Sequence, residues 1–242
     1  MVVENAMVLA AGLGTRMRPI TDRMPKPLVP IAGKPLIDYA LDHLREVGCR
    51  QVAVNVHYFA EQMEAHLSAI DDLDIVISDE RSELLNSGGG LVKGLKLLPV
   101  GPTFVMNADL FWVGEARGEP SNLARLASFY DPATMDMAML VVRNEDTTGH
   151  NGKIDFSMDV DGRLRRYDGS GEGVIYAGAI LLDSGLFADA PEGAFNLNIY
   201  FDRAIAAGRL YGLMLEGHWI TAGTPDAIGP AENAVRRFGR SG

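Results

Sequence analysis

The residues best suited to chemistry lie near the beginning of the chain, in the stretch "VLAAGLGTRMRPITDRMPKP" at positions 8–27. Gly12 and Gly14 follow a short apolar run, and Arg16 comes two residues later. A glycine-rich loop after a buried strand exposes backbone N–H groups that can hold phosphate. Lys26 lies between two prolines, which stiffen the backbone around it. An arginine and a lysine that converge on such a loop suit a triphosphate, whose several negative charges need several donors.

The spacing of these glycines disfavours the two commonest phosphate-binding motifs. It fits neither the G-x-G-x-x-G of dinucleotide-binding proteins nor the G-x-x-x-x-G-K-[ST] of P-loop enzymes. The loop belongs to a basic patch made of Arg16, Arg18, Arg23, Lys26 and Lys34. We therefore expect a triphosphate loop of another type. The alternative is that these residues are solvated surface charges beside an ordinary turn.

A second set of polar residues ends the apolar run "VMNADLFW". Asn107 and Asp109 would lie at the carboxyl edge of a sheet, where ligands of α/β proteins bind. A carboxylate there suits Mg²⁺, which prefers one or two carboxylates together with water and phosphate oxygens. We expect Asp109 to bind the metal, with a structural capping role as the alternative; the family resemblance described below implies that Asn107 contacts a sugar or phosphate.

Composition limits the classes of partner. The 242 residues carry a formal net charge of −10, which disfavours nucleic acid because its phosphates require a basic face. No apolar stretch reaches the roughly 18–20 residues that span a bilayer, and the N-terminus lacks signal-peptide features. The single cysteine, Cys49, is expected to be a packing residue. We expect a cytoplasmic protein without nucleic-acid or membrane partners, either a monomer or a weak homodimer.

The expected elements alternate between strand and helix, which predicts a doubly wound α/β sheet in a single domain over 1–242. The expected strands are 6–11, 51–58, 74–80, 103–112 and 135–143, and the expected helices are 35–48, 60–70, 88–98, 121–130, 198–208 and 224–238. Met135, Met137 and Met139 alternate with the period of a strand and are expected to fill the core. Thr224 is expected to cap the last helix.

Turn signals "DVDG" and "GSGEG" separate strand-like runs between the main sheet and the C-terminal helices. They predict a β-rich insertion around 143–182. Such an insertion can wall one side of a pocket; the family resemblance described below implies that it binds the sugar of a substrate.

The segment "LAAGLGTRMRPITDRMPKPLVPIAGKPLI" resembles the signature of the sugar-1-phosphate nucleotidylyltransferase family, L-A-A-G-x-G-[ST]-R-[ML]-x-P-x-T-x-x-x-P-K-P. The resemblance continues through "NVHY", "SGGGLVKGL", "NADLFW" and "GHWITAGTPDAI", so it covers almost the whole chain. Within this family the length and the later segments most resemble the bacterial enzymes that uridylylate N-acetylmuramate 1-phosphate in cell-wall recycling.

The resemblance implies a mixed, mostly parallel sheet and a Mg²⁺-dependent transfer of a nucleotidyl group from a nucleoside triphosphate to a sugar 1-phosphate. The implied substrates are UTP and N-acetylmuramate α-1-phosphate. The implied catalytic residues are Arg16, Lys26 and Asp109, and the nucleotide contacts are Ala11, Gly12, Gly14, Thr15, Arg16, Lys26, Glu83, Ser87 and Gly88. The implied sugar contacts are Asn107, Gly149, Asp155, Tyr176 and Gly178.

One position departs from the family pattern. The family's H-W-x-D-x-G-T, whose aspartate is a second metal ligand, stands here as "HWITAGT", with Thr221 in place of the aspartate. Thr221 could still touch the ion while substrate phosphates supply the missing charge, or the enzyme could have lost turnover. We expect the first, and assign the metal to Asp109 and Thr221.

Three functions stay open at this point. One is uridylyl transfer to N-acetylmuramate 1-phosphate, whose lactyl carboxylate calls for a positive group; Arg143, Lys153 or Arg203 could serve. Another is a sister enzyme that uses mannose with guanosine or glucose with thymidine. The last is a catalytically silent sensor of sugar nucleotides. His57, His66 and His218 are expected to be structural, whereas His150 lies on a polar loop and is either solvated or near the sugar.

Overall fold

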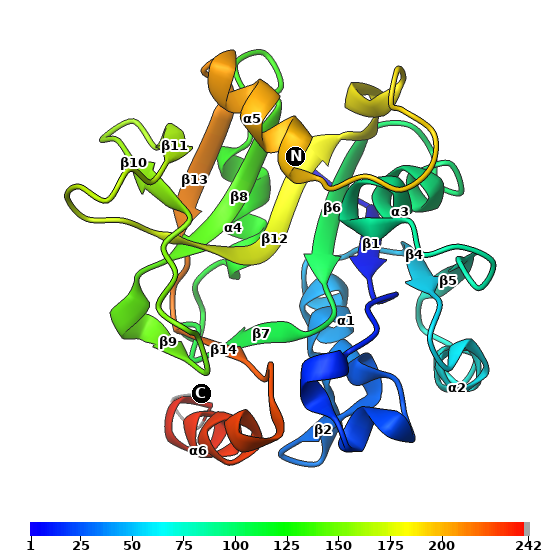
Figure 1. The fold of residues 1–242 in the computed structure, drawn as a ribbon. Coiled ribbons are helices and arrows are strands. Elements are labelled where there is room, and N and C mark those ends of the chain that lie inside the picture. Colours follow the sequence, from blue (N-terminus) through cyan, green and yellow to red (C-terminus); the bar gives the residue numbers. More distant parts are fainter. Residues whose placement is uncertain (240–242) are drawn as a thin grey trace.

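A seven-stranded sheet forms the centre of the computed structural model, which describes residues 1–239 (Figure 1). Its strands are β1 (Asn5–Leu9), β4 (Gln51–Val56), β5 (Asp74–Asp79), β6 (Pro102–Asn107), β8 (Met137–Val142), β12 (Ile175–Asp183) and β13 (Leu210–Met214). They lie in the order β13-β8-β12-β6-β1-β4-β5. β12 is antiparallel to β6 and β8, and the other neighbouring pairs are parallel. The expected doubly wound, mostly parallel sheet is therefore confirmed.

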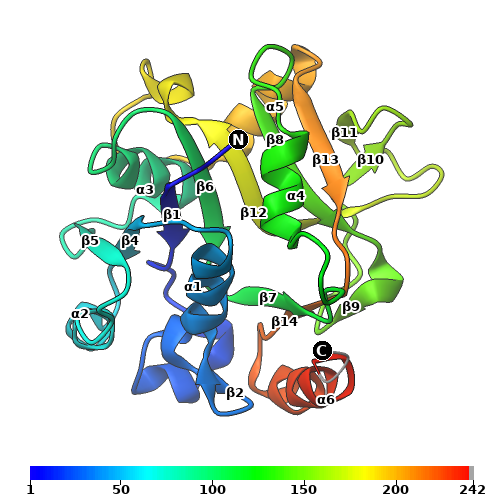
Figure 2. The ribbon, with the colours of Figure 1, turned by 180° about the vertical axis from the view of Figure 1, so that it is seen from behind.

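Helices cover both faces of this sheet (Figures 1 and 2). They are α1 (Leu36–Glu46), α2 (Ala60–Leu67), α3 (Asn86–Leu95), α4 (Asn122–Phe129) and α5 (Asn198–Ala206), whereas α6 (Ile228–Phe238) lies outside the main sheet. α1, α2 and α4 share one hydrophobic cluster with the sheet, and α3 and α5 share another on the opposite face. Strands enclosed on both faces must be apolar along their whole length. β8 meets this demand, since all its residues are buried, Met137 and Met139 among them.

Smaller sheets lie outside the main one. The pairs are β2 (Pro30–Ile31) with β3 (Lys34–Pro35), and β10 (Phe156–Met158) with β11 (Leu164–Arg166). A three-stranded sheet joins β7 (Leu110–Val113), β14 (His218–Thr221) and β9 (Thr147–Thr148).

The third hydrophobic cluster joins the two ends of the chain. Met17, Val29 and Ile31 from the N-terminal segment pack with Phe111 of β7, Ile220 of β14, and Ala231 and Ala234 of α6. Segments far apart in sequence therefore lie side by side below the main sheet, where Figure 1 shows α6 close to β2. This cluster supports the basic N-terminal segment from beneath.

Three expectations about elements were wrong. The strand expected over 103–112 is divided into β6 and β7, because the chain turns at Ala108 and Asp109. The β-rich insertion expected around 143–182 ends earlier, because β12 is a central strand of the main sheet. Thr224 does precede a short 3₁₀ turn, but its side chain makes no capping hydrogen bond.

Within residues 1–239, no helix has both the length and the apolar character that crossing a membrane requires.

Candidate functional site

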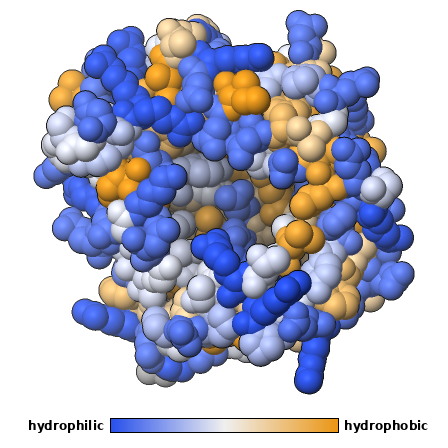
Figure 3. All heavy atoms as spheres, in the orientation of Figure 1, coloured by the Kyte–Doolittle hydropathy of each residue, from blue (hydrophilic) through white to orange (hydrophobic). Residues whose placement is uncertain are grey.

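A cleft opens where β1, β4 and β6 end. Its first cavity, of about 390 Å³, is lined by Leu9, Ala10, Ala11, Gly12, Lys26, Pro27, Asn55, Glu80, Leu84, Asn86, Ser87, Asn107, Ala108, Asp109 and Asn196. A second cavity of about 230 Å³ shares Leu9, Ser87, Asn107 and Asn196 with the first, so the two are continuous. The space-filling view shows that the middle of this face is hollowed (Figure 3). The carboxyl edge of a parallel sheet is the usual place for a ligand in this fold class.

The glycine loop lies at the rim of the first cavity. Gly12 is exposed and lines it, together with the buried Ala11. Gly14 has a left-handed backbone, with a φ of 62°, and its carbonyl accepts a hydrogen bond of 2.8 Å from the Thr21 hydroxyl. A side chain at Gly14 would also crowd Lys26, because an added Cβ would lie 2.9 Å from the Cβ of that lysine. Glycine is therefore required there for both its conformation and its size.

Thr15 and Arg16 follow in a 3₁₀ turn over Thr15–Met17, and both side chains are exposed. The guanidinium of Arg16 lies beside Gly223, since a Cβ added to that glycine would be 3.7 Å from Nη1. Arg16 thus extends from the glycine loop toward the segment that follows β14, at the same end of the molecule as Thr221.

Lys26 and Asp109 form an ion pair inside the cleft. The Nζ of Lys26 donates to Oδ2 of Asp109 at 2.6 Å, and the two side chains are 10% and 40% exposed. Lys26 begins a 3₁₀ turn directly after Pro25, whose extended backbone aims the lysine inward. Two residues that the sequence assigned to different tasks are thus in direct contact.

A buried polar network at the floor of the cavity was missed by the sequence analysis. Asn55 Oδ1 accepts from the Ala10 N–H at 2.6 Å, and its Nδ2 donates to Oε1 of the fully buried Glu80 at 2.6 Å. The other carboxylate oxygen of Glu80 accepts from the Leu85 N–H at 3.1 Å. A buried carboxylate must be satisfied in this way. The network ties the ends of β1, β4 and β5 to the segment before α3. The polar residues that end the apolar strands, in "NVHY" and "SDE", were its signal in the sequence.

Of the residues expected to contact the base, Ser87 lines the cleft, whereas Glu83 and Gly88 do not. Ser87 lines both cavities, and its hydroxyl accepts from the Leu197 N–H at 3.0 Å. Gly88 is buried, and its N–H donates to the Phe195 carbonyl at 2.9 Å. Glu83 is exposed and does not line the first cavity, whereas Leu84 and Asn86 beside it do.

Of the five residues expected to contact the sugar, three line the second cavity and two do not. Asn107, Asp155 and Tyr176 line the second cavity, and Oδ2 of Asp155 accepts from the Tyr176 N–H at 3.0 Å. The Tyr176 hydroxyl is buried without a hydrogen-bond partner among the described residues, and burial raises its pKa. Gly149 and Gly178, both with φ near 80°, are not among the residues that line this cavity.

These two glycines pack against the neighbouring sheet instead. Gly149 lies against the backbone of Thr221, and Gly178 lies against the side chain of Leu110. A side chain at either position would overlap these neighbours. Their contacts are therefore with the strands that carry the expected metal ligands.

The two expected metal ligands lie at the ends of neighbouring segments: Asp109 precedes β7 and lines the first cavity, whereas Thr221 ends β14 and lines neither cavity. Thr221 pairs with Leu110 in the antiparallel β7–β14 ladder, so it lies next to Asp109. Asp109 supplies one carboxylate, and Mg²⁺ takes one or two carboxylates when phosphate oxygens and water complete its shell. The residues present are therefore compatible with a divalent ion bound together with the phosphates of a substrate.

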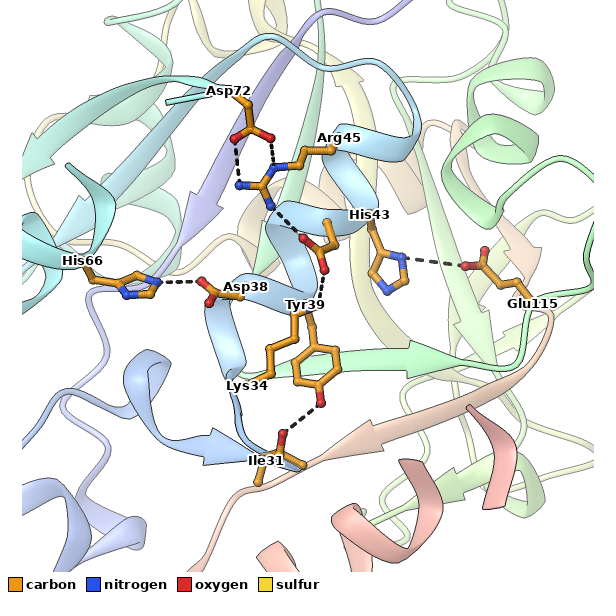
Figure 4. Close-up of polar contacts among 10 residues, drawn as sticks. Ile31, Lys34, Asp38, Tyr39, His43, Arg45, His66, Asp72 and Glu115 are labelled. Atoms are coloured by element: carbon orange, nitrogen blue, oxygen red, sulfur yellow. Dashed lines mark hydrogen bonds and ion pairs between the residues drawn. The ribbon is translucent and has the colours of Figure 1, made fainter. Parts of the chain in front are cut away.

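A different group of possible metal ligands lies away from the cleft. Among the described residues, His43, Glu46 and Glu115 are the group of three whose ligand atoms lie close together. His43 stacks on Trp112 with 4.1 Å between ring centroids, and its Nδ1 is 3.7 Å from Oε2 of Glu115 (Figure 4). Burial lowers the pKa of His43 to about 4. A neutral, stacked histidine is a packing residue between α1 and the segment after β7.

The other histidines have partners within the protein. The contacts are His57 Nδ1 with the Glu80 carbonyl at 2.7 Å, His66 Nε2 with Asp38 at 2.6 Å (Figure 4), His218 Nε2 with the Thr148 hydroxyl at 2.8 Å, and His150 Nε2 with the Lys153 carbonyl at 2.8 Å. Cys49 is buried, and burial raises the pKa of its thiol to about 12, as befits a packing residue.

Comparison with known proteins shows the family to which the chain belongs. Residues 5–165 match the sequence model of a family described as nucleotidyl transferase. The chain is 41% identical over 233 residues to the N-acetylmuramate alpha-1-phosphate uridylyltransferase of Caulobacter vibrioides, covering 94% of this chain and 95% of that protein. The protein of the same name from Neisseria meningitidis serogroup B is 30% identical over 223 residues, covering 91% and 93%.

Solved structures share the fold. A UDP-glucose pyrophosphorylase complexed with UDP-glucose matches with a TM-score of 0.77 at 19% identity, covering 97% of this chain and 99% of that one. The inositol-1-phosphate CTP transferase from T. maritima matches with a TM-score of 0.77 at 13% identity, covering 97% of both chains.

Proposed function

The chain belongs to the nucleotidyl transferase family and is a sugar-1-phosphate nucleotidyltransferase, and we propose that it transfers uridylyl from UTP to N-acetylmuramate α-1-phosphate. The observation that carries this proposal is the 41% identity, over nearly the full length of both chains, to an enzyme named for that reaction. An oxygen of the sugar 1-phosphate bonds to the α-phosphorus of UTP. The bond from that phosphorus to the bridging oxygen breaks, and pyrophosphate leaves. UTP and sugar phosphates are cytoplasmic metabolites, so the proposal implies a cytoplasmic enzyme in cell-wall recycling.

The residues at the rim of the first cavity are assigned to the triphosphate. Ala11, Gly12 and Gly14 supply backbone N–H groups, Thr15 a hydroxyl, and Arg16 a positive charge for the leaving pyrophosphate. Transfer of this type needs no nucleophilic side chain, because catalysis consists of positioning and charge stabilisation. The exposed position of Arg16 beside Gly223 supports this role, since a bound triphosphate at the rim is within reach of a flexible arginine.

The Lys26–Asp109 pair is assigned to the reacting phosphates. Without substrate, each charge neutralises the other inside the cleft. Incoming phosphate oxygens compete with Asp109 for Lys26, so the lysine is free to neutralise the α-phosphate or the sugar phosphate. The released carboxylate of Asp109 is then available for a divalent ion, which members of this family generally require, and we assign Mg²⁺. When bound, Mg²⁺ would neutralise negative charge on the substrate phosphates.

The remaining assignments follow the two cavities. Ser87, with the neighbouring backbone before α3, is assigned to the uracil, and Asn107, Asp155 and Tyr176 are assigned to the sugar. The buried, unpartnered hydroxyl of Tyr176 supports the sugar assignment, because a buried polar group without a partner calls for a polar ligand. Glu83, Gly88, Gly149 and Gly178 line neither cavity, so we assign them no direct contact with the substrates.

Thr221 favours a second candidate, a sensor that binds sugar nucleotides without turnover. The departure from the family's aspartate is the observation behind it. The pairing of Thr221 with Leu110, the residue after Asp109, supports instead the proposal that Thr221 belongs to the metal site. If this is so, Thr221→Asp should be neutral or activating and should lower the Mg²⁺ concentration needed for half-maximal rate. A stable Thr221→Asp protein with much lower activity would contradict it.

The proposed function is tested by measuring pyrophosphate release with Mg²⁺ across a panel of nucleoside triphosphates and sugar 1-phosphates. We expect the highest kcat/KM with UTP and N-acetylmuramate α-1-phosphate. Preference for mannose 1-phosphate with GTP, or for glucose 1-phosphate with dTTP, would replace this assignment. Nucleotide binding in calorimetry without release from any pair would establish the sensor.

A further inference from the structure

The second cavity contains a cation that the sequence analysis did not consider. Within the described part of the chain, Arg166 is the one lysine or arginine among the residues that line it. The three cations suggested by the sequence lie elsewhere: Arg143 lines a separate cavity near Glu145, Lys153 is exposed on a loop, and Arg203 lies over the Tyr200 ring at 5.0 Å. The positive charge available to a sugar substituent therefore comes from Arg166.

Arg166 is held in place by contacts on its edge and on its faces. Its Nε donates to Oδ1 of Asp202 at 2.8 Å, and its Nη2 donates to Oδ1 of Asn198 at 2.8 Å. The two acceptors are four residues apart on α5 and so share one face of that helix. The guanidinium carbon lies 5.0 Å from the ring centroid of Phe156 and 6.0 Å from that of Phe201. Such contacts restrict an otherwise flexible side chain and reduce the entropy lost on binding.

Arg166 lies in a different part of the cleft from the residues assigned to the phosphates. The other polar side chains that line this cavity are neutral amides and hydroxyls, with the exception of Asp155. The carboxylate of Asp155 accepts a hydrogen bond from the Tyr176 N–H. The basic residues assigned to phosphate, Arg16 and Lys26, do not line it. Asp202, the ion-pair partner of Arg166, does not line the cavity, so Arg166 is the charged donor at the sugar end of the cleft, and a neutral sugar ring offers it no anionic group.

We propose that Arg166 forms a carboxylate-binding subsite, which selects sugar 1-phosphates that carry an acidic substituent over their neutral counterparts. This inference rests on the proposed function, because N-acetylmuramate is N-acetylglucosamine with a 3-O-lactyl ether, and that ether carries the carboxylate. The side chain of Arg166 is 40% exposed, Nε and Nη2 are held by Asp202 and Asn198, and Nη1 has no hydrogen-bond partner among the described residues, so it is free to donate to a ligand. A guanidinium presents its donors in a planar fork that matches a carboxylate, and a lysine does not.

The test compares two substrates that differ by the lactyl ether and its carboxylate. Wild type, Arg166→Gln and Arg166→Lys are assayed with UTP and either N-acetylmuramate α-1-phosphate or N-acetylglucosamine α-1-phosphate. Arg165→Gln is the matched control, because the neighbouring residue in a strand points to the opposite face. We expect Arg166→Gln to lower kcat/KM for the acidic substrate by about 10- to 100-fold, the usual range for a hydrogen bond to a charged group.

The rate with the neutral substrate should stay constant or rise in Arg166→Gln, and Arg166→Lys should keep more of the preference than Arg166→Gln. The subsite would be overturned if Arg166→Gln lost kcat/KM equally with both substrates or kept the wild-type preference for the acidic substrate. It would also be overturned if Arg166→Lys kept less of that preference than Arg166→Gln. Failure of the proposed function is distinguishable, since wild type would then use neither substrate with UTP, or would already prefer the neutral one.

Discussion

Replacement of Lys26 by methionine separates the catalytic role of the Lys26–Asp109 pair from its contribution to stability. Methionine keeps most of the apolar stem, which is 90% buried with the rest of the side chain, and removes only the charge. The carboxylate left behind on Asp109 is 40% exposed, so water can solvate it. We therefore expect the free energy of unfolding to fall by only about 1 kcal/mol, which lowers Tm by about 2–4 °C in a domain of this size.

Turnover should fall far more than stability. A preorganised charge aimed at a reacting group contributes about 10²- to 10³-fold to the rate. The assay is pyrophosphate release at saturating Mg²⁺, with thermal unfolding measured on the same preparations. Lys34→Met is the control, because Lys34 belongs to the same basic segment but pairs with Asp42 and lies 4.4 Å from the Tyr39 ring centroid, outside the cleft (Figure 4).

Three outcomes would refute this reasoning. The first is Lys26→Met turnover within about threefold of wild type, well short of the loss expected for a preorganised charge. The second is a comparable loss in Lys34→Met, which would make the effect one of overall charge. The third is a fall in stability of more than about 3 kcal/mol, the penalty expected for a buried pair broken on one side. That result would show that the ion pair holds the fold together.

Further predictions concern the metal ligand, a buried glycine and a buried histidine. Asp109→Asn should lower turnover by about 10²- to 10³-fold while UTP binding in calorimetry is retained, because the amide oxygen can still accept from the lysine; near-normal turnover would contradict the metal assignment. Gly88→Ala should lower the free energy of unfolding by about 1–3 kcal/mol in urea titrations, because the added methyl would overlap Phe195; an unchanged midpoint would show that this contact gives way. The pKa of His43 is about 4 in the folded protein and about 6.5 in the unfolded chain, so its contribution to stability is complete above pH 6.5 and is lost as the pH falls toward 4. The loss should total about 3 kcal/mol, and His43→Gln should flatten the pH dependence of unfolding in this window; an equal slope in both proteins would assign the titration elsewhere.

The alternation of strands and helices could be predicted from sequence because each element has a clear periodicity. β8, with its alternating methionines, and α1, with its apolar face, were correctly placed. β12 was placed in an insertion because the sequence of a strand does not reveal its neighbours. Its apolar run fits a small sheet as well as the centre of a large one, and only the pairing with β6 and β8 decides.

The cleft residues that belong to recognisable sequence motifs could be predicted. Those that join the cleft only through tertiary contacts could not. The positions of Gly12, Lys26 and Asp109 at one cavity agree with the expectation from the motifs. Glu80 was missed because a lone acidic residue after a strand carries no sign of burial until Asn55 is seen to donate to it. Arg166 was missed because its place in the second cavity depends on the β10–β11 hairpin and on α5, which are joined only by the tertiary fold.

The cluster that joins Met17, Val29 and Ile31 to β14 and α6 has a consequence for the order of events during protein synthesis. The first strands can pair while the rest of the chain is still being made, because β1, β4 and β5 are close together in sequence. The segment that carries Arg16 and Lys26 gains its supporting apolar surface only after residues 218–238 have left the ribosome. The first strands of the sheet can therefore pair early, whereas β12 and β13 join it later and the apolar support of Arg16 and Lys26 is completed last.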